Sequence, residues 1–83
     1  MASATPIIDH HLVMHWIESH AGRPAHVART ARGENPGELT IEFEHTQSQD
    51  VEELPWDKWL RWFERNRLAL VVDNSGFNKL VPR

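Results

Sequence analysis

Three histidines lie within the segment DHHLVMHW, residues 9–16, and imidazole is a common ligand of transition metals in proteins. His11 and His15 are spaced i, i+4, so on a helix both rings could reach one ion, with Glu18 on the same face. A catalytic zinc site also needs a third ligand and a second shell, and no H-E-x-x-H pattern is present. We therefore interpret this face as solvated, predict no metal ligands, and expect His10 to pack or hydrogen-bond locally.

A second candidate is a row of basic side chains around a tryptophan, on a helix expected to start near Pro55. Lys58, Arg61, Trp62 and Arg65 share the face opposite the apolar one. Such a row could contact nucleic-acid backbone and stack on a base, or act as a protein hot spot. A third interpretation is a solvated face whose tryptophan rests against a neighbouring loop. The net charge of -3 disfavours nucleic acid.

Other routes to catalysis find no support in the sequence. The chain has no cysteine, which excludes thiol nucleophiles and thiolate metal sites. It has no nucleophile elbow, phosphate-binding loop or dinucleotide fingerprint. Carboxylates such as Asp57 and Glu64 flank one helix and should face solvent, whereas acid catalysis needs a carboxyl in an apolar pocket. We predict a protein that is not an enzyme, with no catalytic residues and no cofactor.

The first half of the chain reads as a helix followed by a hairpin. The helix runs from about Ile8 to His20, and Gly22 is its expected C-terminal cap. Its apolar arc consists of Ile8, Leu12, Val13, Trp16 and Ile17. The runs AHVART, residues 25–30, and ELTIEFEH, residues 38–45, are expected strands on either side of a Pro-Gly turn. TQSQDVEE, residues 46–53, is an expected polar loop.

The second half repeats the order of elements. Pro55 suits the first position of a helix. The apolar face of that helix consists of Trp56, Trp59, Leu60 and Phe63. LALVVD, residues 68–73, avoids water on both sides and is expected to be a central strand. A turn then leads to a last strand, FNKLV, residues 77–81.

The order α-β-β-α-β-β predicts an α+β fold, with a four-stranded, mostly antiparallel sheet and two helices packed on one face. We expect residues 8–83 to form a single small domain, because one chain of this length supports one core. Residues 1–7 are expected to be a disordered N-terminal segment.

The ordered series of residues resembles that of a family of short, uncharacterised bacterial proteins. The matching positions are Asp9-His10, Trp16, Glu18, Gly22-Arg23-Pro24-Ala25, Val27, Pro36-Gly37, Leu39, Ile41, Phe43, Trp56-Asp57, Phe63-Glu64, Leu68-Ala69-Leu70 and Phe77-Asn78-Lys79-Leu80-Val81. The resemblance covers nearly all of the chain from about Asp9 onward. It implies that FNKLV belongs to the natural protein and forms its last strand. Some members carry the label 1,4-alpha-glucan branching enzyme. That chemistry needs a barrel of roughly 250 residues, which this chain cannot build.

Apolar residues stand where the resemblance would place charged or small ones. These positions are Leu12, Met14, Ile17 and Trp62. The surplus apolar surface of Met14, Ile17 and Trp62 favours a homodimer or a protein partner. We therefore predict a non-enzymatic protein-interaction module that binds through Met14, Lys58, Arg61, Trp62 and Arg65. The alternative is a nucleic-acid-binding accessory protein that uses the basic helix face.

No apolar run is long enough to cross a bilayer, so we expect no membrane association. The N-terminus lacks a basic segment followed by an apolar one, which argues against a signal peptide. A cytoplasmic location is the resulting expectation.

Overall fold

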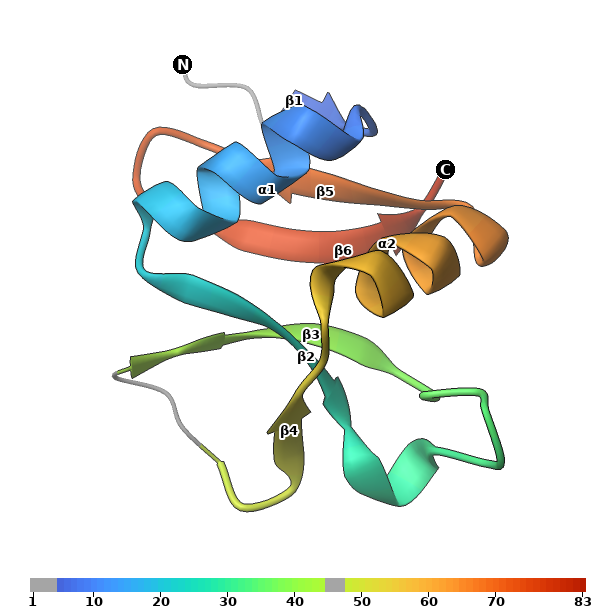
Figure 1. Cartoon of the computed structure of the whole chain (residues 1–83). Helices are drawn as coiled ribbons and strands as arrows, with labels where there is room; N and C mark the ends of the chain where they lie inside the picture. Colours follow the sequence, from blue (N-terminus) through green and yellow to red (C-terminus); the bar gives the residue numbers. More distant parts are fainter. Residues whose placement is uncertain (1–4, 45–47) are drawn as a thin grey trace.

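The structure is a computed structural model that describes residues 5–44 and 48–83 (Figure 1). In chain order the elements are β1 (Thr5–Ile7), α1 (His10–Ser19), β2 (Gly22–Val27), the 3-10 turn η1 (Ala28–Thr30), β3 (Leu39–Phe43), β4 (Val51–Glu53), α2 (Trp56–Arg65), β5 (Leu68–Val72) and β6 (Asn78–Pro82). Within these ranges the strands form two three-stranded antiparallel sheets, ordered β1-β5-β6 and β3-β2-β4. The mixed helix and strand content agrees with the sequence prediction.

The single four-stranded sheet is not what the structure shows. Both predicted hairpins form, because β2 pairs with β3 and β5 pairs with β6. Each hairpin then gains a third strand, since β4 pairs with β2 and β1 pairs with β5. These additions occupy the second edges of β2 and β5, so the two hairpins could meet only through β3 and β6.

Both additional strands come from segments that were expected to be irregular. Thr5–Ile7 was expected to belong to a disordered segment but forms a strand, and residues 1–4 of that expected segment lie outside the described residues. Val51–Glu53 forms a strand within the segment expected to be a polar loop. The amide of Leu54 still donates to the Pro24 carbonyl at 2.9 Å, but Pro24 has no N–H to return a bond. The pairing of β4 therefore ends at this point.

The first helix has different ends from those expected. Asp9 caps it, because its carboxylate accepts the amide of Leu12 at 3.1 Å. The chain leaves the helix through Ala21, whose φ of 59° is left-handed. Gly22 is therefore not the cap but the buried first residue of β2. A Cβ there would lie 2.9 Å from the side chains of Ile41 and Phe43, so the site requires glycine because space is lacking.

The buried stripe of α1 is narrower than the predicted arc. Val13 and Ile17, spaced i, i+4, are fully buried. Leu12 is 58% exposed on the helix, and Ile8 is 53% exposed because it precedes the helix. Ile17 therefore belongs to the core, as the apolar arc predicted, and not to the surplus apolar surface in which it was also counted.

The second helix agrees more closely with its pattern. Trp59 and Phe63 are fully buried, while Trp56 and Leu60 are partly buried against the core. Pro55 is the N-terminal cap residue, one position before the place predicted for it. Asp57 lies in the first turn, where a negative charge interacts favourably with the helix dipole.

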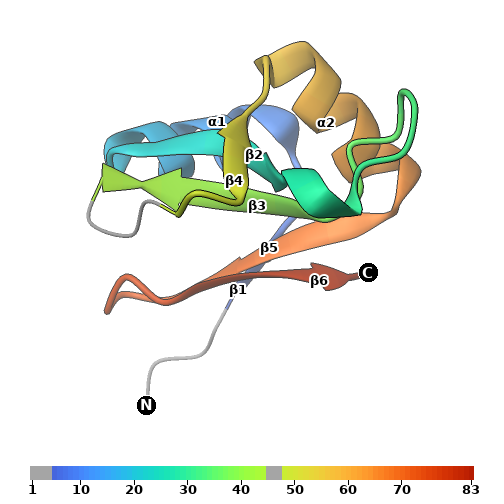
Figure 2. The same cartoon turned by 90° about the horizontal axis from the view of Figure 1, so that it is seen from below.

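Both helices pack over the sheets. In Figure 1 they lie in front of the β1-β5-β6 sheet and above β2 and β3, and Figure 2 shows them on the same side of β5 and β6. The fully enclosed core between these layers consists of Val13, Ile17, Leu39, Leu54, Trp59, Phe63, Leu70 and Val72. Neither helix in the described part of the chain has the length and apolar content needed to span a bilayer.

Candidate interaction surfaces

The predicted basic row forms one surface on the outside of α2. Lys58, Arg61, Trp62 and Arg65 are spaced so that successive turns of the helix place them on the same side. Together with Glu34, from the segment between η1 and β3, they line a hollow of about 220 Å³. We call this surface the basic groove.

The basic groove carries a net positive charge, because its lining holds three cations and one carboxylate. No ion pair among the described residues involves Lys58, Arg61 or Arg65. Glu34 is the carboxylate in the lining of the hollow. The guanidinium of Arg65 lies 4.9 Å from the centre of the Trp62 ring, which is cation–π distance. The groove can therefore attract an anionic group, and one of its cations, Arg65, is held over the Trp62 ring.

Trp62 is not the freely exposed aromatic that a stacking platform needs. It is partly buried and packs against the hydrophobic core. Met14 is also partly buried, lies on α1, and is not among the residues that line the basic groove. The structure thus brings together four of the five predicted partner-binding residues and leaves Met14 elsewhere.

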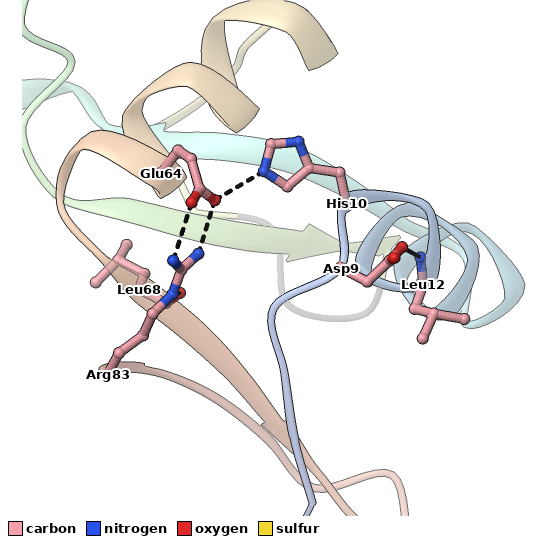
Figure 3. Close-up of polar contacts among 6 residues, drawn as sticks. All are labelled: Asp9, His10, Leu12, Glu64, Leu68 and Arg83. Atoms are coloured by element: carbon pink, nitrogen blue, oxygen red, sulfur yellow. Dashed lines mark hydrogen bonds and ion pairs between the residues drawn. The ribbon is translucent and has the colours of Figure 1, made fainter.

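A second polar cluster joins the N-terminus of α1, the C-terminus of α2 and the end of β6 (Figure 3). The carboxylate of Glu64 accepts from both terminal nitrogens of Arg83, at 2.9 and 2.7 Å, and from His10 Nε2 at 2.8 Å. Arg83 Nε also donates to the Leu68 carbonyl at 2.7 Å. We call His10, Glu64 and Arg83 the Glu64 node. His10 thus hydrogen-bonds to a residue 54 positions away instead of locally.

The Glu64 node holds charges in place and is poorly suited to acid catalysis. Hydrogen bonds from Arg83 first, and from His10 second, lower the pKa of Glu64 from 4.5 to about 2. Glu64 is therefore ionised at neutral pH and cannot donate a proton there. The guanidinium of Arg83 also lies over the Phe63 ring, at 5.6 Å from its centre. Sequence patterns gave no sign of this cluster, because its members lie far apart in the chain.

The histidines of α1 and β2 have different surroundings. His11, His15 and Glu18 are exposed, and the described residues include no group of three His, Cys, Asp or Glu side chains placed to hold a metal ion. His26 is buried, and its Nδ1–H donates to the Pro36 carbonyl at 2.7 Å. His26 therefore fastens the segment before β3 to β2, a role that the sequence analysis did not identify.

The face of the β1-β5-β6 sheet opposite the core is apolar but carries no helix among the described residues (Figure 2). Leu70 and Val72 point into the core, so alternation directs Ala69 and Val71 to this opposite face. A hollow of about 420 Å³ lies here, lined by Pro6, Ile8, Ala69, Val81, Pro82 and Arg83. We call it the apolar hollow. β5 is the central strand of its sheet, as predicted, and on this face Ala69 is buried while Val71 is partly buried.

Comparison of the chain with protein-family models, with curated proteins and with solved structures finds no match. The resemblance to short bacterial proteins therefore stays a prediction. Function has to be inferred from the surfaces themselves, of which the basic groove has the most distinctive chemistry.

Proposed function

We propose that the protein is a non-enzymatic interaction module that binds an acidic segment of a partner protein in the basic groove. The observation that carries the proposal is the set of three cations, without ion pairs among the described residues, that surround Trp62 in one hollow. This positive patch stands on a chain whose net charge is -3. A local excess of positive charge on a chain whose net charge is negative indicates a surface that serves recognition.

The side chains of the basic groove suit carboxylate recognition. Arginine can bind a carboxylate through two parallel hydrogen bonds, and Arg61 and Arg65 lie one helical turn apart. Tryptophan and arginine are also the residues that most often dominate binding energy at protein interfaces. Because the hollow is small, it fits a short acidic stretch better than a broad protein surface.

The test uses a fluorescein-labelled peptide of eight glutamates and fluorescence anisotropy at low salt. We expect saturable binding that weakens as salt rises, and at least a tenfold loss of affinity in the double variant Arg61→Glu, Arg65→Glu. Lys79→Glu is the control, because it reverses an exposed cation on β6 outside the groove. Equal affinity for wild type and the double variant would remove the basic groove from the proposal.

Nucleic-acid binding is the alternative, and the combination of Trp62 with three cations favours it. The partial burial of Trp62 reduces the ring area that a base could cover. A labelled oligouridylate in the same assay separates the two ideas. Binding of the oligouridylate but not of the glutamate peptide, lost in the double variant, would replace the protein partner with single-stranded RNA.

Self-association has separate support in the apolar hollow. Ala69 and Val81 lie at neighbouring positions of β5 and β6, and Pro6 and Ile8 extend the same apolar surface. Two copies could cover these surfaces by meeting face to face about a two-fold axis. Sedimentation equilibrium of wild type and Val81→Glu tests this: we expect a dimer that the charge dissociates. A wild-type chain that stays monomeric at millimolar concentration would exclude it.

A further inference from the structure

Two sheet edges that no described strand pairs with lie beside each other in this fold. β3 is an edge strand of one sheet and β6 is an edge strand of the other. Residues 38–41 of the β3 side and 78–80 of β6 line the same depression, whose volume is about 280 Å³. We call this depression the slot. In Figure 2, β3 lies between β2 and the β1-β5-β6 sheet.

The main chain of β3 can be assigned to its two sides from the hydrogen-bond register. The amide of Val27 donates to the Glu38 carbonyl at 2.9 Å, in line with the β2–β3 pairing. Alternate residues of an antiparallel strand direct their N–H and C=O groups to the same side. Glu38 and Thr40 therefore face β2, and Leu39 and Ile41 direct their backbone groups away from it, toward the slot.

The same reasoning applies to β6. The amide of Asp73 donates to the Phe77 carbonyl at 3.3 Å, and the amide of Arg83 donates to Arg67 at 2.8 Å, at the two ends of the β5–β6 pairing. The odd-numbered residues of β6 therefore face β5, so that Asn78 and Leu80 direct their backbone groups to the free edge. No strand among the described residues pairs with either edge.

The side chains of the slot give it an apolar floor and a rim of balanced charge. Leu39 is buried, and Ile41 and Leu80 are partly buried against the core. Glu38 and Lys79 add one charge of each sign to the lining. A ligand of the slot would therefore gain little from net charge and much from main-chain hydrogen bonds.

We propose that the slot binds an extended segment of a partner protein as an added β-strand. Free edges with unused N–H and C=O groups are templates for pairing, and here both walls of one depression supply them. The arrowheads of β3 and β6 point in opposite directions in Figures 1 and 2, so the added strand runs parallel to one wall and antiparallel to the other. Once bound, it joins the two sheets into one continuous sheet.

The register defines the kind of segment that fits. Alternate side chains of the added strand point toward the floor, so every second residue is apolar. The segment contains no proline at positions whose backbone faces a wall, because each such residue must donate its N–H to a carbonyl of that wall. This site does not depend on the basic groove, which lies on the outside of α2 and prefers acidic chains.

The test begins with a display library of random 12-residue peptides selected against the immobilised wild-type chain. Selected peptides are synthesised, and amide hydrogen exchange of the protein is measured with and without each one. We expect the amides of Leu39, Ile41, Asn78 and Leu80 to slow at least tenfold on binding, while those of Thr40 and Lys79, already in ladders, change little. Failure to select any peptide, or protection confined to other surfaces, overturns the proposal.

A pair of variants isolates the main-chain contribution. Asn78→Pro removes an amide that faces the slot without removing a bond to β5, and Asn78→Ala removes only the side chain. We expect Asn78→Ala to bind a selected peptide like wild type and Asn78→Pro to bind it roughly tenfold more weakly. Far-UV circular dichroism checks that both variants fold. Equal binding by both variants contradicts strand addition, and equal binding by Arg61→Glu, Arg65→Glu shows that the basic groove is not the site.

Discussion

In addition to the apolar core that α2 shares with both sheets, each sheet is joined to α2 by polar contacts, and these are of opposite character. On the β3-β2-β4 side, the fully buried Trp59 donates its indole N–H to the carbonyls of Ala25 and Thr40, at 3.1 Å each. On the β1-β5-β6 side, α2 is joined through Arg83 and Glu64, whose side chains are 27% and 49% exposed. Buried hydrogen bonds are shielded from competing water, whereas exposed ion pairs are screened by salt and cost side-chain entropy.

The two attachments should therefore differ in how much they contribute to stability and in how strongly they respond to pH and salt. The attachment through Trp59 should be costly to break under all solution conditions, because removing a large buried ring also leaves a cavity. The attachment through the Glu64 node should respond to pH and salt while contributing less. The following variants test this contrast, from the largest expected effect to the smallest.

Trp59→Ala should destabilise the protein by about 3–5 kcal/mol, because a fully buried aromatic ring and its hydrogen bonds are both lost. Urea denaturation followed by circular dichroism measures this change. Trp56→Ala is the control on the same helix, since Trp56 is only partly buried and makes no hydrogen bond of this kind among the described residues. Equal losses for the two variants would show that Trp59 does not dominate the attachment.

Gly22→Ala should destabilise the protein by about 1–3 kcal/mol, because the new methyl group meets Ile41 and Phe43 at 2.9 Å and Ile17 at 3.1 Å. The neighbouring change, Ala21→Gly, should not destabilise the fold, because Ala21 has a left-handed φ that glycine adopts without strain. Thermal denaturation of both variants gives the comparison. A neutral Gly22→Ala would mean that β3 shifts easily relative to α1.

His26→Leu should lower the free energy of unfolding by about 1–2 kcal/mol, because the Pro36 carbonyl then loses its hydrogen bond from the buried imidazole. Urea denaturation measures the loss. His15→Leu is the control, because His15 is exposed on α1. A loss for His15→Leu as large as that for His26→Leu would argue against a structural role of the buried imidazole.

Glu64→Gln should have the smallest effect at neutral pH, and that effect should depend on pH. The pKa of Glu64 is lowered from 4.5 to about 2 in the folded chain, so its ionised form stabilises the fold above pH 4.5. This contribution is lost as pH falls from 4.5 through about 2. We therefore expect the stability difference between wild type and Glu64→Gln to shrink over this window and to shrink with added salt.

The measurement is urea denaturation of both chains at several pH values between 2 and 7. Glu44→Gln is the control, because Glu44 is exposed and forms no ion pair among the described residues. A difference between wild type and Glu64→Gln that is constant with pH would contradict an ionic role for the Glu64 node.

Sequence patterns predicted the elements whose residues alternate clearly or follow a helical period. The helix of residues 56–65 and the two hairpins were found this way, because each has an apolar face that must be buried. The prediction that Leu12 lies on the buried face of the first helix was wrong, because α1 buries only the stripe that contains Val13 and Ile17.

The sheet arrangement could not be predicted because it depends on two strands of three residues each. Thr5–Ile7 and Val51–Glu53 are too short to show a period, and they gain stability by pairing with strands already present. Of the candidate site, helical spacing alone placed the basic row on one face. The Glu64 node and the buried His26 depend on tertiary contacts, for which the sequence holds no local signal.

The pairing of β1 with β5 has a consequence for synthesis on the ribosome. Thr5 lies opposite Val72, and Ile7 opposite Leu70, so β1 must wait for a segment that is translated much later. The β2–β3 hairpin, in contrast, joins neighbouring segments and can form as soon as both emerge. Such distant pairings slow folding, which leaves the nascent chain with an unprotected apolar surface until β5 and β6 leave the exit tunnel.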